Sequence, residues 1–128
     1  MTDDQVIDGV GYRTFHTDSG PIRRRYYTYV NNRHPPHEGP VHPQYISFKK
    51  RLESFVDWPT RCPKRPKDLA AAGFFYDGFA DGFLDCVKCF YCDQGVCLWE
   101  ASDNPFQEHR KLNPACDFMR ALSDGHFM

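Results

Sequence analysis

The first clear hydrophobic period in this chain starts after residue 44. Phe48, Leu52 and Phe55 fall at positions i, i+4 and i+7, which together form one face of a helix. Ser47 suits the N-cap, and the helix should end at Trp58, because a residue that precedes proline is driven out of the α region. We therefore predict an amphipathic helix over this segment, with its apolar face toward a core.

Two further helices are predicted along the chain, and a last helical segment covers residues 116–122. The run from Lys67 to Ala72 has high helix propensity, and Gly73 can adopt the left-handed conformation that ends a helix. Asn104 is the predicted N-cap of the next helix, and Pro105 takes its first position. That helix should end before the proline at position 114.

Short strands should lie between these helices. Residues 77–85 contain glycines and acids and are predicted to form a loop, and Asp93 to Gly95 form a turn in which Gly95 adopts positive φ. Apolar and aromatic runs predict strands at residues 74–76, 87–90 and 96–99. The pattern indicates a small α+β domain in which short helices surround a three-stranded antiparallel sheet.

The region before this domain has a different character. Residues 1–44 show no sustained period of 2 or 3.6, and proline recurs in them, at positions 21, 35, 36, 40 and 43. Arg23 to Arg25 run into a tyrosine-rich stretch, which suits either a partner-binding segment or a solvated linker, and we favour the linker. We predict a flexible, extended arm at 1–44, a packed domain at 45–122 and a tail at 123–128.

Charge and hydropathy narrow the classes of function. The formal net charge of -1 argues against a nucleic-acid-binding surface, which normally carries a basic excess. No stretch has the apolar length that crosses a bilayer, and the acidic N-terminus lacks the pattern of a secretory signal. We therefore expect no nucleic-acid partner, no membrane partner and a cytoplasmic location. The sequence carries no signal for an oligomeric state.

In a reducing compartment, clustered cysteines are more often metal ligands than disulfides. The chain has six cysteines. Cys89 and Cys92 have CxxC spacing, and His109 and Cys116 complete a Cys₃His set. Such a set is typical of one structural zinc ion. Because it leaves no coordination position for water, we do not expect an enzyme.

Spacing alone leaves the ligand register open. Cys86 and Cys89 form a second CxxC pair, and Cys97 is a further candidate ligand. In an extended strand Cys86 would project away from a site built by Cys89, which suits an unpaired thiol. Cys62 is isolated in its loop and is predicted to be a free thiol. Three disulfides would form only in an oxidising setting.

A longer pattern surrounds these ligands, between about Arg51 and Met119. It comprises Arg51-Leu52-x-Ser54-Phe55-x-x-Trp58-Pro59, Leu69-Ala70-x-Ala72-Gly73-Phe74-x-Tyr76, Asp85-x-Val87-Lys88-Cys89-Phe90-x-Cys92, Trp99, Asp103-x-Pro105-x-x-Glu108-His109 and Pro114-x-Cys116-x-Phe118. Together these motifs resemble the baculoviral inhibitor-of-apoptosis repeat, or BIR, domain. The resemblance implies a BIR-like zinc-binding fold and places the zinc ligands on Cys89, Cys92, His109 and Cys116, with Cys86 left over.

The resemblance also implies a peptide-binding function. BIR domains of the inhibitor-of-apoptosis class add a short N-terminal peptide, usually beginning with alanine, to the third strand of their sheet. That strand corresponds here to Gly95, Val96, Cys97, Leu98 and Trp99. Asp103 and Glu108 match positions that face the cationic amine of the peptide, and Val96 and Trp99 would line a pocket for a methyl group.

The implied partners are free N-termini of caspases or of pro-apoptotic proteins, in the host cytoplasm if the chain is viral. We therefore expect a non-enzymatic inhibitor of apoptosis. Leu112 stands at a peptide-contacting position where many members have tryptophan, which removes a flat aromatic wall from the groove. No RING-type cluster follows Met119, so we expect no ubiquitin-ligase activity. The alternative function is direct caspase inhibition through the arm at 1–44.

Overall fold

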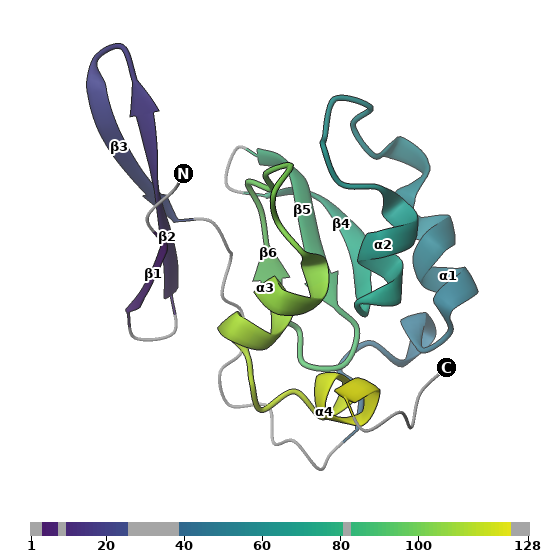
Figure 1. The fold of residues 1–128 in the computed structure, drawn as a ribbon. Coiled ribbons are helices and arrows are strands. Elements are labelled where there is room, and N and C mark those ends of the chain that lie inside the picture. The colour runs from purple at the N-terminus through teal and green to yellow at the C-terminus, as the bar shows by residue number, and fades with distance from the viewer. Residues whose placement is uncertain (1–3, 8–9, 26–38, 81–82, 124–128) are drawn as a thin grey trace.

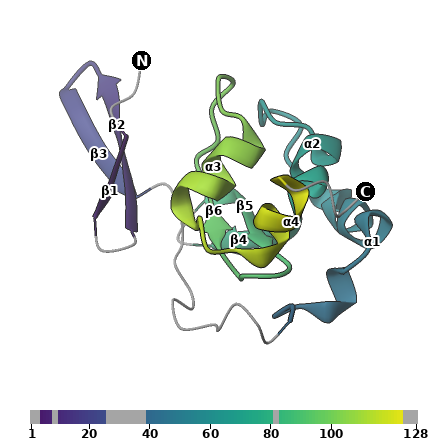
Figure 2. The same cartoon turned by 60° about the horizontal axis from the view of Figure 1, so that its bottom comes forward.

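The computed structural model describes residues 4–7, 10–25, 39–80 and 83–123 (Figure 1). The described strands form two three-stranded antiparallel sheets, with the orders β1-β2-β3 and β4-β5-β6. The helices follow the first sheet in the chain and lie around the second sheet (Figures 1 and 2). No helix in the described ranges has the length and apolar character that crossing a lipid bilayer requires.

The first sheet lies in the segment that we predicted to be without regular structure. It contains β1 (Asp4–Ile7), β2 (Val10–Thr17) and β3 (Gly20–Arg25). Pro21 of β3 opposes His16 of β2, and proline is tolerated there because β3 is an edge strand. The sequence did not predict these strands, because residues 1–44 show no sustained period of 2 or 3.6. Residues 26–38, which include the tyrosine-rich stretch, and residues 124–128 of the predicted tail lie outside the described ranges.

The second sheet carries the domain. It contains β4 (Phe74–Ala80), β5 (Phe83–Cys89) and β6 (Gly95–Val96). The predicted loop at 77–85 was wrong, because β4 and β5 extend through most of it. The register between these two strands shifts on both sides of Gly78, between Tyr76 and Ala80. Strand β6 is shorter than predicted and ends at Val96.

The helices begin where the capping signals predicted. Ser47 Oγ accepts a 3.1 Å hydrogen bond from the N–H of Lys50, and Asn104 Oδ1 accepts from the N–H groups of Phe106 and Gln107 at 2.9 and 3.2 Å. These bonds satisfy donors that have no partner within a helix. The helical elements are η2 (Pro43–Tyr45), α1 (Phe48–Glu53), η3 (Ser54–Asp57), α2 (Pro66–Ala71), α3 (Pro105–Leu112) and α4 (Asp117–Ser123).

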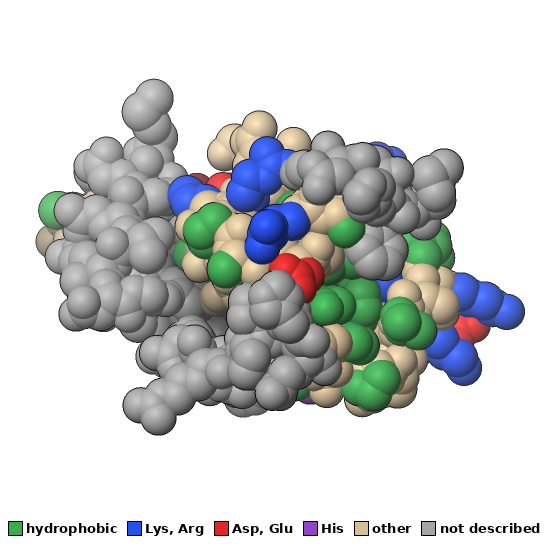
Figure 3. All heavy atoms as spheres, turned by 90° about the horizontal axis from the view of Figure 1, so that it is seen from below, with side chains coloured by type: hydrophobic (Ala, Val, Ile, Leu, Met, Phe, Trp, Pro, Cys, Tyr) green, Lys and Arg blue, Asp and Glu red, His purple; other side chains and the backbone are tan. Residues whose placement is uncertain are grey.

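The buried face of α1 differs from the predicted one. Phe48 and Leu52 are each 37% exposed, whereas Arg51 is 5% and Phe55 is 6% exposed. The α-helix ends at Glu53 and continues as a 3₁₀ turn, so only Phe55 of the predicted apolar series reaches the core. Figure 3 shows hydrophobic side chains that remain at the surface beside charged ones on the face seen from below.

The guanidinium of Arg51 holds α1 against its neighbours. Its Nε donates to the carbonyl of Ala70 at 2.9 Å, and its Nη1 donates to the carbonyls of Tyr45 and Ile46 at 3.1 and 2.9 Å. The same group lies over the ring of Phe90, 4.7 Å from its centroid. Carbonyl oxygens and a ring face thus replace the water that a buried cation would lose.

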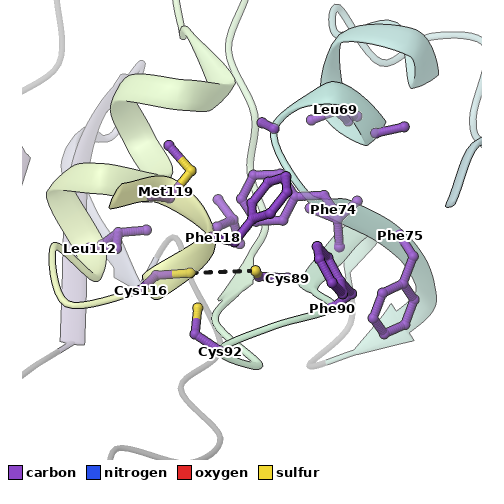
Figure 4. Close-up of a cluster of buried hydrophobic side chains, with 14 of the residues drawn as sticks. Leu69, Phe74, Phe75, Cys89, Phe90, Cys92, Leu112, Cys116, Phe118 and Met119 are labelled. Atoms are coloured by element: carbon purple, nitrogen blue, oxygen red, sulfur yellow. Dashed lines mark hydrogen bonds between the residues drawn. The ribbon is translucent and has the colours of Figure 1, made fainter. Parts of the chain in front are cut away.

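The core lies between the second sheet and helices α2, α3 and α4 (Figures 2 and 4). Its largest fully buried side chains are Phe74, Phe90, Leu69, Met119, His109, Val87, Val96, Cys89 and Cys97. Histidine and cysteine are therefore part of the packed interior, where a polar group needs a partner.

A strap at residues 41–42, just before η2, pairs with the turn that follows β5. The N–H of Val41 donates to the carbonyl of Tyr91 at 3.0 Å, and the N–H of His42 donates to the carbonyl of Phe90 at 2.8 Å. His42 Nε2 also lies 2.7 Å from Asp93 Oδ1. These contacts reach upstream of residue 45, where we predicted the packed domain to start.

Gly73 ends α2 with a φ of +96°, as predicted. Its carbonyl accepts a 3.0 Å hydrogen bond from the N–H of Phe90, which joins α2 to the turn that follows β5. A Cβ added at this position would lie 2.8 Å from Cε2 of Phe118. Both the backbone conformation and the space therefore require glycine.

Replacing Gly73 by alanine should lower the free energy of unfolding by about 3 kcal/mol, because a clash with a core ring adds to the cost of positive φ. Gly39→Ala is the matched control, since Gly39 has a φ of +83° and open space around it. That control should cost about 1 kcal/mol. Urea unfolding followed by circular dichroism measures both values, and equal losses would contradict the proposed clash.

Candidate metal centre and peptide-binding edge

Four side chains from separate parts of the chain converge in the core. Cys89 ends β5, Cys92 lies in the turn after it, His109 lies in the middle of α3, and Cys116 immediately precedes α4. All four are buried, and their ligand atoms lie within 4.8 Å of one another. Figure 4 shows the three sulfur atoms pointing toward one space. The structure thus brings together the four residues that the sequence predicted as ligands.

The separations of these atoms fit a tetrahedral metal site. Sγ of Cys89 lies 4.0 Å from Sγ of Cys116, and Sγ of Cys92 lies 3.5 Å from Nε2 of His109. Zinc bonds of about 2.3 Å to sulfur and about 2.0 Å to nitrogen, at the tetrahedral angle, correspond to separations of about 3.8 Å between two sulfurs and about 3.5 Å between sulfur and nitrogen. The donor set and its geometry therefore fit one structural zinc ion.

The orientation of His109 supports this assignment. Its Nδ1–H donates to the backbone carbonyl of Ala72 at 2.9 Å. Since Nδ1 donates its proton to this carbonyl, Nε2 is the ring nitrogen directed toward the cysteine sulfurs, as a metal ligand requires. The ring also packs against Phe74, with 4.8 Å between the centroids. Ala72 and Phe74 thus hold the imidazole in its ligating orientation.

The protonation of the cluster follows from burial and from contacts among the four groups. Burial raises the pKa of the Cys89 thiol well above its usual value, whereas hydrogen bonds from Cys89 and Cys92 lower the pKa of Cys116. Burial acts to lower the pKa of His109, but hydrogen bonds to Cys116 and Cys92 raise it overall, to about 10. A binding metal ion must therefore displace protons from Cys89 and His109 at neutral pH.

The turn between the first two ligands is built differently from the prediction. Asp93, and not Gly95, adopts positive φ, at 66°. The N–H of Asp93 donates to the carbonyl of Cys89 at 3.0 Å, and the N–H of Tyr91 donates to its sulfur at 3.3 Å. Gly95 instead belongs to β6. Aspartate tolerates the left-handed region better than most residues, so Asp93 can adopt the positive φ that we predicted for Gly95.

The remaining cysteines lie outside the cluster. Cys86 does not share the space of the four ligands, as predicted, but it forms a disulfide with Cys97. The prediction of an unpaired thiol at Cys86 was therefore wrong, because the antiparallel ladder places residue 97 directly opposite it. Cys62 is a free thiol, as predicted, and burial raises its pKa.

Strand β6 ends early because a side chain takes over its hydrogen bonds. The two carboxylate oxygens of Asp85 accept from the N–H groups of Leu98 and Trp99 at 3.1 and 2.9 Å. Leu98 has a φ of 60°, which turns the chain away from the ladder. Sequence reasoning gave Asp85 no role, although an acid one residue before a buried strand segment is a candidate for such a bond.

The predicted anchors for a peptide amine lie in the loop that follows β6 and in α3. The carboxylate of Asp103 accepts from the N–H of Glu100 at 2.7 Å, and Glu108 forms an ion pair with Lys111 at 3.2 Å. Lys64, which sequence reasoning missed, holds the loop at residues 101–103. Its Nζ donates to the carbonyl of Asp103 at 2.6 Å.

Six of the eight predicted groove residues are buried, namely Gly95, Val96, Cys97, Trp99, Glu108 and Leu112. Trp99 is 5% exposed and packs edge-on against Phe74, and among the described residues its Nε1 has no hydrogen-bond partner. Leu112 is 8% exposed and lies in the core near Met119 (Figure 4). A role for Leu112 in contacting peptide stays a prediction.

A family model described as the Inhibitor of Apoptosis domain, BIR, matches residues 51–120. The chain belongs to this family. Its BIR domain is similar to a solved structure, the crystal structure of the autoinhibited dIAP1-BIR1 domain, with a TM-score of 0.53 and 31% identity. That match covers 63% of this chain and 78% of the other. The predicted BIR-like α+β fold is thereby confirmed.

The sequence is similar to longer proteins of the same family. It is 48% identical over 89 residues to baculoviral IAP repeat-containing protein 7-B of Xenopus laevis, which covers 70% of this chain and 25% of that protein. It is 34% identical over 108 residues to E3 ubiquitin-protein ligase IAP-3 of Orgyia pseudotsugata multicapsid polyhedrosis virus, which covers 84% of this chain and 39% of that protein. The chain thus spans well under half the length of these curated relatives.

Removing one ligand of the BIR domain should abolish both zinc binding and cooperative unfolding. Cys92→Ala should lose its zinc and its thermal transition, because a structural zinc ion supplies on the order of 10 kcal/mol in small domains. A chelator should have the same effect on the unmodified chain. Cys62→Ala is the matched control and should keep both properties. Metal content and a thermal melt measure them, and one zinc ion per chain in Cys92→Ala would contradict the site.

The apparent zinc affinity should rise with pH near neutrality. Cys89 and His109 each hold a proton below their raised pKa values and must lose it on binding, whereas Cys116 is already a thiolate. At least two protons must therefore leave on binding, which corresponds to an increase of about a hundredfold or more per pH unit. Competition with a chelator of known pH dependence, together with direct measurement of proton release, tests this. A release of less than one proton per zinc ion would contradict the assignment.

Proposed function

We propose that this chain suppresses apoptosis as a non-enzymatic binding module in the cytoplasm. Its BIR domain would hold the free, alanine-starting N-termini of caspases or of pro-apoptotic antagonists along residues 95–99. Membership of the inhibitor-of-apoptosis family supports the general role. The finer assignment rests on the edge of the second sheet. Direct caspase inhibition through residues 1–44 stays a prediction from the sequence.

The orientation of the backbone at β6 carries this proposal. Cys89 N–H donates to the carbonyl of Gln94 at 2.9 Å, which makes these residues a hydrogen-bonded pair in the ladder. Hydrogen-bonded and non-hydrogen-bonded pairs alternate along an antiparallel ladder, so Gly95 and Cys97 belong to non-hydrogen-bonded pairs. Their N–H and C=O groups therefore point away from β5. An added peptide strand needs these outward-directed groups. Figure 1 shows β6 at the side of the sheet away from β4.

The surroundings of this edge suit the start of a peptide. An α-amino group is cationic at neutral pH, and the carboxylates of Asp103 and Glu108 provide negative charge beside the edge. The indole Nε1 of Trp99 is a buried donor without a partner in the described ranges, and a peptide carbonyl would satisfy it. A metal bound at this centre would hold β6 and α3 together, because Cys89 and Cys92 precede β6 and His109 lies in α3.

A peptide with a free N-terminal alanine should bind about tenfold or more tightly than its N-acetylated form, because acetylation removes the charge that the acids recognise. Asp103→Asn should remove most of that difference. Asparagine keeps an oxygen for the N–H of Glu100, so the loop should stay folded. Fluorescence anisotropy with peptides labelled at the C-terminus measures all four affinities.

Asp68→Asn is the matched control, since Asp68 lies on α2 with half of its side chain exposed. It should bind both peptides as the unmodified chain does. Equal affinity for the free and the acetylated peptide would contradict the proposed groove.

A further inference from the structure

Cys86 and Cys97 lie directly opposite each other on neighbouring segments of the second sheet. The register pairs Lys88 with Gly95 and Val87 with Val96, so the next pair outward from the metal-binding turn is Cys86 with Cys97. Their Cα atoms are 4.4 Å apart, close to the roughly 4.5 Å of a non-hydrogen-bonded pair, in which opposing side chains come nearest. The ladder itself therefore brings the two thiols together.

This cysteine pair is separate from the metal centre. Side chains alternate between the two faces of a strand, so Cys86 points to the face opposite that of Cys89. The metal ligands hold β5 and β6 at their turn, and the disulfide holds them at the other end. The hairpin thus has the metal site at one end and the disulfide at the other. Thiols and disulfides in solution can open or close the disulfide without removing the metal.

The disulfide is attached to a residue of the proposed peptide-binding edge. The N–H and C=O groups of Cys97 point outward from β5, whereas its side chain is bonded to β5. Strand β6 contains only two residues, and Cys97 lies just beyond it. On the other side, Asp85 holds the N–H groups of Leu98 and Trp99. The disulfide therefore fixes the position of the backbone between the end of the ladder and the Asp85 contacts.

We propose that Cys86 and Cys97 are a redox-modified pair that sets the affinity of this edge for peptide, which rests on the function proposed above. The reaction is exchange with a low-molecular-weight disulfide. The thiolate of one cysteine attacks the small disulfide and releases a small thiol, and the second cysteine then displaces another small thiol from the mixed disulfide. Two protein thiols become one disulfide, and one small disulfide is reduced to two thiols.

The oxidised form binds peptide more tightly. A backbone that is already held in its bound position loses less conformational entropy on binding, which favours the crosslinked edge by about tenfold. Thermodynamic linkage requires the converse effect, so saturating peptide should favour the disulfide by the same factor. For this two-electron couple, a tenfold factor corresponds to about 30 mV in reduction potential. Since Cys86 and Cys97 are only 3% and 2% exposed, exchange requires the edge to open, and bound peptide should also slow it.

The test uses the full zinc-loaded chain equilibrated in buffers of reduced glutathione and glutathione disulfide. Alkylation and mass spectrometry identify which cysteines are oxidised, and metal analysis shows that zinc is retained. Binding of an alanine-starting tetrapeptide is then measured on each form. A chain carrying both Cys86→Ser and Cys97→Ser is the test variant, and Cys62→Ser is the matched control.

We expect reversible oxidation of Cys86 and Cys97 alone, about tenfold tighter binding after oxidation, and loss of that difference only in the double variant. Equal affinity of the two forms, or no disulfide between these residues in the zinc-loaded chain, would overturn the proposal. Oxidation that pairs metal ligands and releases zinc would overturn it as well. If neither form binds peptide, the proposed function fails and redox control of binding fails with it, whereas thiol identification still shows whether the pair forms.

Discussion

The convergence of Cys89, Cys92, His109 and Cys116 on one point is the constraint on which the rest of the domain depends. No described helix exceeds the eight residues of α3, and helices of that length are not stable alone in water. The ligands join the turn after β5 to α3 and to the start of α4. Since β6 follows that turn, and Asp103 and Glu108 lie just before and within α3, a metal bound there would also position the candidate binding edge.

The features predicted correctly from the sequence are those that depend on neighbouring residues. The caps at Ser47 and Asn104, the stop at Gly73 and the grouping of three cysteines with one histidine follow from local chemistry or from fixed spacing. The family pattern then resolved the choice between Cys86 and Cys92, which spacing alone left open. Local rules were sufficient wherever the partner of a residue is only a few positions away or is a metal ion.

The predictions that failed concern contacts between distant residues. The buried face of α1 turned toward Arg51 because three carbonyls and an aromatic ring were available to its guanidinium. Likewise β6 stops where Asp85 supplies acceptors, and Cys86 has a partner because of the strand register. The first sheet was missed because its strands carry a weak apolar alternation and a proline. None of these causes can be recognised before the register and the packing are known.

The strap formed by Val41 and His42 has a consequence for where the folded domain begins. The family model begins at residue 51, yet the backbone of the strap pairs with Phe90 and Tyr91 in the turn that carries Cys92. A segment excised at the limits of the shared pattern would leave those two carbonyls facing solvent. The folded unit is therefore longer than the motif by which the domain is recognised.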